Sequence, residues 1–264
     1  MRVLFLGDVF GKPGRQAVQR LVPRLITRLG ADLVVANAEN ASNGVGVTPD
    51  AAEELLASEV DLLTSGNHIW VKREIGPYLD APKSRLLRPA NYPKGAPGRG
   101  RGIATTPDGK RLGVVNVEGR VFMKALDDPF PAALAEVEAL KAEGCRAILV
   151  DVHAEATSEK TALAHYLDGK VSAVIGTHTH VQTADERLLP GGTAFISDAG
   201  MCGPRDSVIG VRKELVLERF LTQRPVAFEP AKKDVWINAV LIEIDDASGL
   251  ARSIVRVQEK VEET

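Results

Sequence analysis

The sequence predicts an α/β protein built around a parallel sheet. Short apolar runs alternate with stretches whose apolar residues recur at helical spacing, and the first 65 residues read as strand, helix, strand, helix, strand. This order is typical of parallel strands with helices on the sheet faces. The chain has 264 residues, of which 44% are apolar, so it can bury a sizeable core.

The first half of the chain contains the clearest elements. Apolar spacing predicts a helix over 14–30, in which Pro23 indicates a kink or a late start. Thr48 as N-cap and Pro49 at the first helical position predict a second helix over 48–58. The expected strands are 2–7, 32–38 and 60–65.

The second half adds two hairpins to the alternating pattern. A Gly/Pro-rich basic stretch, 91–102, precedes a hairpin expected over 103–120, and a second hairpin is expected over 234–258. The other expected elements are helices over 131–145 and 158–169 and strands over 147–155, 171–180 and 193–200. Because we find no repeat, linker or low-complexity tract, we expect one domain over 1–264, and periodicity alone suggests a simple doubly wound sheet.

Composition excludes several classes of protein. The net charge is −2 and the pI about 6.2, so we expect no strong nucleic-acid surface. No apolar run approaches the roughly 20 residues that cross a bilayer, so we expect no membrane segment. Cys145 and Cys202 provide no disulfide framework, and we expect a cytoplasmic location.

Polar side chains of one kind follow the expected strands at the point where each strand ends. Parallel strands place their carboxyl ends at one edge of the sheet, where open α/β sheets bind ligands. Residues far apart in sequence should therefore meet there. These residues are Asp8, Glu39, Asn40, Asn67, His68, His153, His178 and His180.

This set consists of two carboxylates, two amides and four imidazoles, which suits first-row divalent metals. One tetrahedral metal would use only about four ligands, so the set predicts two metals about 3.5–4 Å apart, bridged by a carboxylate. In an extended segment His178 and His180 would point to the same side and could bind one metal each.

Each residue alone has an ordinary structural explanation, such as a helix cap for Asp8 or a buried histidine for His153. The joint pattern favours the metal site, because five separate loops would each need an independent reason. Other polar residues have weaker signals: Lys94, Arg99 and Arg101 in the loop 94–102, and Arg205, could reach a substrate but are more typical of solvated turns. His165 is expected to be structural, and nothing beside Cys202 suggests an activated thiolate.

The ordered blocks "GD", "EN", "GNH", "H" and "GTHTH" resemble the calcineurin-like metallophosphoesterases over residues 7–180. Two departures matter. Phe10 stands where that family usually has a metal-binding histidine, and Glu39 stands where it usually has aspartate. With "GDVFGKPGR", "ANAENAS" and "SDAGMCGPRDSVIG", these departures resemble the YmdB-like branch of bacterial proteins over nearly the whole chain.

The resemblance implies a four-layer αββα sandwich, in which two mixed sheets are flanked by helices. It implies a phosphodiesterase acting on cyclic nucleotides, most often 2′,3′-cyclic ones, through attack by a metal-bridging hydroxide, with His68 as proton donor. Iron or manganese is implied, with zinc as an alternative, in a homo-oligomeric protein. The implied ligands of metal one are Asp8, Glu39, Asn40 and His180, and those of metal two are Glu39, Asn67, His153 and His178.

Three other functions stay open at this point. A phosphomonoesterase could use the same metals. A weakly active regulatory protein could bind a nucleotide or RNA at this site, and the missing histidine at Phe10 leaves room for it. A di-iron redox protein is the third, although the asparagine ligands and "GNH" speak against it.

Overall fold

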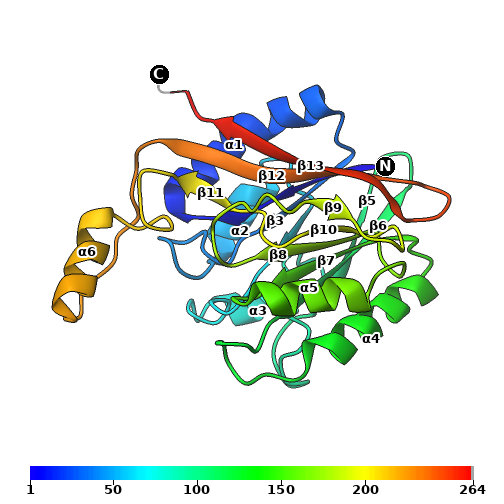
Figure 1. Ribbon diagram of the computed structural model, residues 1–264, viewed down its shortest axis with the longest axis horizontal. Coiled ribbons are helices and arrows are strands. Elements are labelled where there is room, and N and C mark those ends of the chain that lie inside the picture. The colour runs from blue at the N-terminus through cyan, green and yellow to red at the C-terminus, as the bar shows by residue number, and fades with distance from the viewer. Residues whose placement is uncertain (263–264) are drawn as a thin grey trace.

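Two sheets packed face to face form the centre of the protein, and helices cover both outer faces (Figure 1). The computed structural model describes residues 1–262. One apolar cluster lies between the sheets and includes Phe5, Val35 and Leu149. A second packs the first sheet against its helices, and a third does the same for the second sheet. The four-layer sandwich is confirmed, and the simple doubly wound sheet is wrong.

The first sheet has seven strands in the order β2-β11-β12-β1-β3-β4, with β13 beside β12. Its strands β1, β3 and β4 are parallel, whereas β12 runs antiparallel to β1. The strands are β1 (Arg2–Leu6), β2 (Asp8–Val9), β3 (Leu33–Asn37), β4 (Leu62–Thr64), β11 (Met201–Pro204), β12 (Val235–Ile244) and β13 (Ala251–Lys260). β12 and β13 form the expected C-terminal hairpin.

The second sheet has six strands in the order β5-β6-β7-β8-β10-β9. β6, β7 and β8 are parallel, and β5 pairs antiparallel with β6 as the other expected hairpin. The strands are β5 (Arg101–Thr105), β6 (Arg111–Glu118), β7 (Ala147–His153), β8 (Ala173–Thr177), β9 (Arg187–Leu188) and β10 (Ala194–Ile196).

Most of the helices pack their apolar residues against the outer faces of the two sheets. α1 and α2 cover the first sheet, and α4 and α5 cover the second. The helices are α1 (Gly11–Leu29), α2 (Pro49–Leu56), α3 (Ile75–Asp80), α4 (Pro129–Ala142), α5 (Thr157–Tyr166) and α6 (Lys213–Thr222). The Thr48 side chain accepts a hydrogen bond from Ala51 N at 3.2 Å, as a cap should. α1 begins well before Pro23, so the late start is wrong.

Several segments depart from the expected pattern. α3 and α6 were not predicted, because each buries few side chains and so shows little apolar periodicity. β8 ends at Thr177, so the expected extended segment through His180 is wrong. That 1–264 forms one domain stays a prediction. Within residues 1–262, no helix combines the length and apolar character needed to span a membrane.

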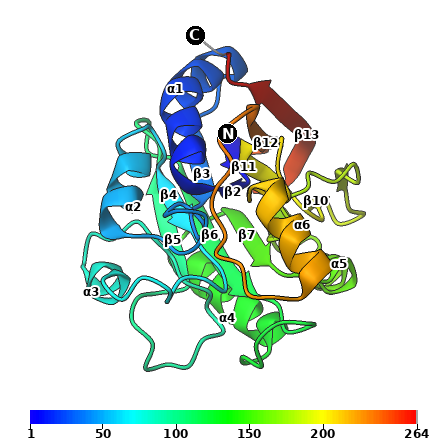
Figure 2. The same ribbon diagram turned by 90° about the vertical axis from the view of Figure 1, so that its left-hand side faces the viewer.

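Residues 205–234, which we call the arm, connect β11 to β12 and contain α6. The arm projects from the end of the sandwich where the parallel strands terminate (Figures 1 and 2). Within this segment, all of which the structure describes, only Gly210, Val216 and Ala231 are buried. At its base, Ala231 N donates to Gly210 O at 2.8 Å and Arg205 N to Asp234 O at 2.8 Å, so the arm begins and ends at one place.

Candidate dimetal centre

The site lies where the strand ends of the two sheets meet, a line that we call the seam. Asp8, Glu39 and Asn67 follow β1, β3 and β4 of the first sheet. His153 ends β7 and His178 follows β8 of the second sheet. All eight residues singled out in the sequence come together here, linked by the contacts described below: Asp8, Glu39, Asn40, Asn67, His68, His153, His178 and His180.

The Glu39 carboxylate is the centre of this group and is fully buried. Its Oε1 lies 3.1 Å from His153 Nε2, 3.2 Å from His68 Nδ1 and 3.0 Å from the Asn40 amide nitrogen. Burial opposes its ionisation, but the charges and hydrogen bonds of His153 and His68 outweigh burial and hold the pKa of Glu39 well below its usual range. Glu39 is therefore an anion between two groups of potential ligands.

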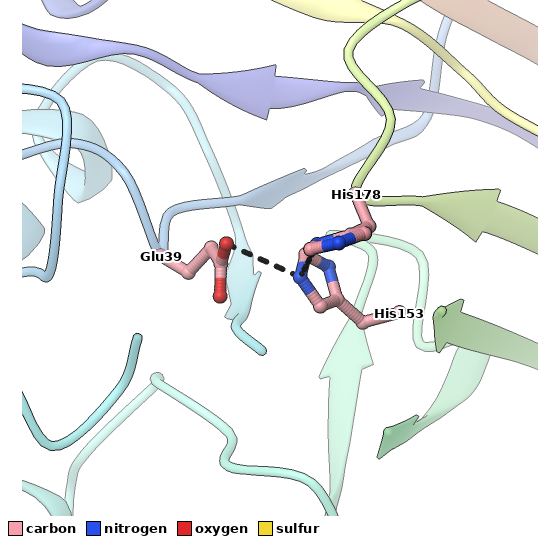
Figure 3. A group of neighbouring side chains, drawn as sticks. All are labelled: Glu39, His153 and His178. Carbon is pink, nitrogen blue, oxygen red and sulfur yellow. Dashed lines mark hydrogen bonds and ion pairs between the residues drawn. The ribbon is translucent and has the colours of Figure 1, made fainter. Parts of the chain in front are cut away.

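Glu39, His153 and His178 present ligand atoms that all lie within 4.8 Å of one another (Figure 3). His153 Nε2 lies 3.0 Å from His178 Nδ1 and 3.0 Å from Asn67 Oδ1. Burial lowers the pKa of His153, but Glu39 and other nearby carboxylates more than offset this and raise it to about 9. Burial and the neighbouring His153 lower the pKa of His178 to about 3. A cation fits this convergence of lone pairs better than a shared proton does.

Asp8 marks the other half of the site. Its carboxylate is fully buried, and among the described residues Oδ1 has no hydrogen-bond partner. Oδ2 accepts from His178 N at 3.1 Å, and His180 Nε2 lies 3.8 Å from Oδ1. Burial raises the pKa of Asp8 despite the two nearby histidines, His180 and His153. A buried carboxylate oxygen without a donor fits a metal ligand.

The hydrogen bonds of the three histidines leave one nitrogen of each ring facing inward. His153 Nδ1 lies 2.9 Å from Thr177 Oγ1, and His180 Nδ1 lies 2.9 Å from Ile209 O. His178 Nε2 lies 3.0 Å from Glu155 Oε2. Outer partners of this kind fix the tautomer of a metal-binding histidine. The donor set therefore fits divalent metal ions.

Asp151 on β7 supports the site from below and was not found from the sequence. It is fully buried and accepts hydrogen bonds from Asn37 Nδ2 at 3.0 Å, Thr64 Oγ1 at 2.5 Å and Thr177 Oγ1 at 2.7 Å. Burial raises its pKa to about 6, against the effect of His153 and these donors. Since Thr177 donates to Asp151, its oxygen is free to accept from His153 Nδ1.

A buried ion pair holds the loop between the last two histidines, and it too was missed. Lys160 Nζ of α5 donates to Asp198 Oδ2 at 2.9 Å, and both side chains are buried. The same oxygen accepts from Thr179 N at 3.0 Å and Thr179 Oγ1 at 2.7 Å. Thr179 lies between His178 and His180, whose φ angles of 101° and 64° place them in the left-handed region. The loop needs this support because its backbone is strained.

His68 lies at the surface of the group and is partly exposed. Its Nδ1 lies 3.0 Å from Asn40 Oδ1, and its backbone N donates to Glu39 Oε2 at 3.0 Å. The Asn40 Nδ2 faces His180 Nε2 at 3.1 Å. For Asn40 to bind a cation, its amide must turn so that Oδ1 takes this place and Nδ2 faces His68.

Close packing around the site accounts for Gly66 and for Phe10. A Cβ on Gly66 would lie 2.1 Å from His153 Cδ2, so only glycine allows the ring to reach its place in "SGNH". Phe10 is buried and meets the His180 ring edge to face at a centroid distance of 5.6 Å. It fills apolar space against Gly44 and Gly210 and offers no ligand.

Among the residues with weaker signals, the three arginines have other contacts, and Lys94 lies exposed. Arg99 donates to Ser84 O, Arg101 pairs with Glu136 and Glu143, and Arg205 stacks on Trp236. His165 lies exposed in the last turn of α5. Burial raises the pKa of Cys202 to about 12, as expected for a thiol that is not activated.

A cavity of about 860 Å³ opens over the metal-binding group and leads to the arm. Glu39, Asn40, His68, His178 and His180 line one side of it, and Glu155 lies beside them. Arm residues line the opposite side. This volume suits a small organic phosphate.

Two mixed sheets flanked by helices, with carboxylate, amide and imidazole donors at the seam, define the calcineurin-like metallophosphoesterase class. The sequence model of the YmdB-like protein family matches residues 4–257, and the chain belongs to this family.

Relatives cover the whole length of the chain. A 2′,3′-cyclic-nucleotide 2′-phosphodiesterase of Bacillus subtilis (strain 168) is 47% identical over 257 residues, which cover 97% of this chain and 96% of that protein. A hypothetical protein from Thermus thermophilus has a solved structure with a TM-score of 0.91 and 43% identity, covering 98% of this chain and 99% of that one. The solved structure of a phosphatase from Mycoplasma pneumoniae has a TM-score of 0.88 and 33% identity, and the match covers 98% of this chain and 93% of that one.

Proposed function

We propose that the protein is a dimetal phosphodiesterase that hydrolyses 2′,3′-cyclic nucleotides. The observation that carries this proposal is the convergence of Glu39, His153 and His178 beside the buried, unpartnered Asp8 oxygen. The Bacillus subtilis relative bears the name of this activity and aligns along nearly the whole chain, which supports the substrate class.

Two sets of residues would hold the metals. Asp8, Glu39, Asn40 and His180 would bind metal one, and Glu39, Asn67, His153 and His178 would bind metal two. When bound, the two cations supply positive charge to the phosphoryl oxygens and lower the pKa of attacking water. We propose iron or manganese, with zinc as the alternative, since these ligands accept all three.

His68 would protonate the leaving ribose oxygen. His68 Nδ1 lies 3.2 Å from Glu39 Oε1, so this carboxylate can accept the Nδ1 proton of an imidazolium form of His68, and Nε2 would carry the proton that is transferred. His68 lines the cavity, so this proton can reach a substrate. A ribose alkoxide is a poor leaving group, and a positioned acid typically contributes about 10²–10⁴-fold.

The test is hydrolysis of a phosphoester panel by purified protein, with added manganese and with chelator. The panel contains 2′,3′-cyclic AMP, 3′,5′-cyclic AMP, an aryl diester and an aryl monoester. We expect metal-dependent cleavage of the 2′,3′-cyclic diester, lost in Glu39→Ala, whose fold is checked by circular dichroism. Cleavage of the monoester alone would replace the diesterase with a phosphomonoesterase. Metal binding without any turnover would favour a regulatory nucleotide-binding protein.

We also propose that the protein is cytoplasmic and homo-oligomeric. Both proposals derive from the family resemblance and the absence of a disulfide framework in the sequence. Sedimentation velocity of the metal-loaded protein measures the second; a single species of about 28 kDa would refute it.

A further inference from the structure

The cavity wall that faces the metal-binding group is apolar and comes from the arm. The arm side chains on this wall include two phenylalanines and several branched aliphatic residues, with arginine and glutamine at the edge. They are Val208, Ile209, Val211, Val216, Arg219, Phe220, Gln223 and Phe228. The arm also contributes Pro230 and Glu229, whose carboxylate pairs with Arg212 at 3.0 Å. One side of the cavity is therefore built for an anion and its metals, and the other for an apolar group.

The large side chains of this wall are exposed to solvent. Phe220 is 71% exposed, Ile209 54% and Phe228 44%. Exposed apolar side chains gathered at a pocket commonly mark a binding surface. Leu217 and Leu221, also exposed on α6, do not line the cavity, so α6 has an inner and an outer apolar face.

The polar groups beside the two rings suit a flat ligand with a polar edge. The Arg219 guanidinium lies over the Phe228 ring, with its carbon 5.1 Å from the ring centre. Arg219 and Gln223 thus bring hydrogen-bond groups next to the apolar surface. Aromatic rings with an adjacent arginine are the usual means by which proteins hold nucleobases.

A direct bond ties this wall to the metal ligands. Ile209 O accepts from His180 Nδ1 at 2.9 Å, while the Ile209 side chain lies on the cavity wall. Ile209 has a φ of 47°, a left-handed backbone that a β-branched residue rarely adopts. The bond therefore fixes the Ile209 part of the wall beside His180, and the same cavity is lined by both the wall and the candidate ligands.

We propose that the inner face of the arm, formed by Ile209, Phe220 and Phe228, is a nucleobase subsite for the substrate. This inference rests on the proposed function, and it adds the group that selects nucleotides over other small diesters. The base stacks on the phenylalanines while its phosphate lies at the metals. Arg219 and Gln223 bind its polar edge.

The test compares two substrates that differ only in the base. One is 2′,3′-cyclic AMP, and the other is 1-O-methyl-ribofuranoside 2′,3′-cyclic phosphate. Wild type should prefer the nucleotide through a lower KM. In Phe220→Ala and Phe228→Ala this preference should fall about tenfold, through KM and not kcat. Leu221→Ala, on the outer face of α6, should keep the preference and serves as the matched control.

Several outcomes would overturn the subsite. Equal losses on both substrates would mean that the phenylalanines only support the site. A change in oligomeric state in Phe220→Ala, measured by sedimentation, would make the arm a contact between copies. Calorimetric binding of 3′-AMP against ribose 3-phosphate by manganese-loaded protein separates the two proposals. If no diester is cleaved but 3′-AMP still binds more tightly than ribose 3-phosphate, and Phe220→Ala removes this difference, the nucleobase subsite is supported. The proposed diesterase activity is then wrong.

Discussion

The metal-binding floor and the arm differ in almost every physical respect. The floor, Asp8, Glu39, Asn40 and His153, is buried at the ends of parallel strands. The arm, 205–234, is mostly exposed and contains one short helix. Chemistry at the floor needs fixed distances, and a buried hydrogen-bonded network provides them. Selection at the arm needs an open surface, which the sheets could not provide without losing core.

The two regions also use ion pairs differently. Lys160 and Asp198 lie under the floor with both side chains buried, whereas Lys213 and Asp206 on the arm are about half exposed. A buried pair is costly to break, because the remaining charge has no solvent. A surface pair contributes little. The first comparison to test is therefore one between two lysines.

We expect the largest effect from Lys160→Met, which leaves the Asp198 carboxylate buried without its cation. The free energy of unfolding should fall by about 3–5 kcal/mol. Lys213→Met, the matched change on the arm, should alter it by less than about 1 kcal/mol. Urea denaturation of the metal-free proteins measures both values. Similar changes in the two variants would remove the distinction between floor and arm.

A smaller effect should follow when His153 loses its outer partner. Thr177→Val keeps the shape of the side chain but removes the hydroxyl between Asp151 and His153. Metal affinity and activity should fall by about 10–100-fold, the usual cost of losing an outer hydrogen bond to a ligand. Thr222→Val on the arm removes only exposed hydrogen bonds, to Glu218 O and from Arg224 N, and should change neither metal affinity nor activity. Manganese titration and hydrolysis rates measure both variants. A Thr177→Val protein with the metal affinity and activity of the wild type would contradict the prediction.

Metal binding at the floor should depend on pH through His153. Its pKa of about 9 means that the imidazole is protonated at pH 7 in the metal-free protein and must lose that proton to bind metal. Affinity should rise about tenfold per pH unit from 7 towards 9. The stability of the metal-free fold should change with pH in the opposite direction. Because folding raises the pKa of His153 from 6.5, the protonated ring stabilises the fold fully below pH 6.5, and this stabilisation is lost as the pH rises through about 9.

Calorimetry in buffers of different ionisation enthalpy measures this proton. At pH 7 we expect release of about one proton per protein on manganese binding. Heats that do not depend on the buffer would show that His153 is already neutral.

The smallest expected effect concerns the arm alone. Gly210 has a φ of 99°, and a Cβ there would lie 2.6 Å from the Phe10 ring. Gly210→Ala should loosen the arm by about 1 kcal/mol or more and speed proteolysis within 205–234 about fivefold or more. Gly109→Ala is the control, because it has a similar φ of 86° in open space. A large fall in melting temperature in Gly210→Ala would mean that the arm and floor unfold as one unit.

The positions of the candidate metal ligands could be predicted because they depend on a simple rule. Strands β1, β3 and β4, and β7 and β8, are apolar runs ended by polar residues, and parallel strands bring such ends together. The four layers followed only from the family resemblance, since periodicity does not say how strands divide between two sheets. The backbone of the loop from His178 to His180 also escaped prediction, because tertiary hydrogen bonds to Asp8 and Asp198 hold it.

The residues that were missed share one property, which is that their role depends on what packs against them. Asp151 looks like any polar residue in a strand, and Lys160 looks like a residue on the solvent face of a helix. Each contributes to the candidate site only because a distant segment places Thr177 or Asp198 beside it. α6 was missed because most of its apolar side chains face no core.

The position of the site at the seam links metal binding to the stability of the protein. Glu39 comes from one sheet and His153 and His178 from the other, so a cation shared among them cross-links the two halves of the sandwich. Binding at 100 times the dissociation constant adds about 2.7 kcal/mol to the stability of the folded state. A change of that size alters how much of a protein escapes proteolysis in a cell. Metal supply would then set the abundance of the enzyme as well as its rate.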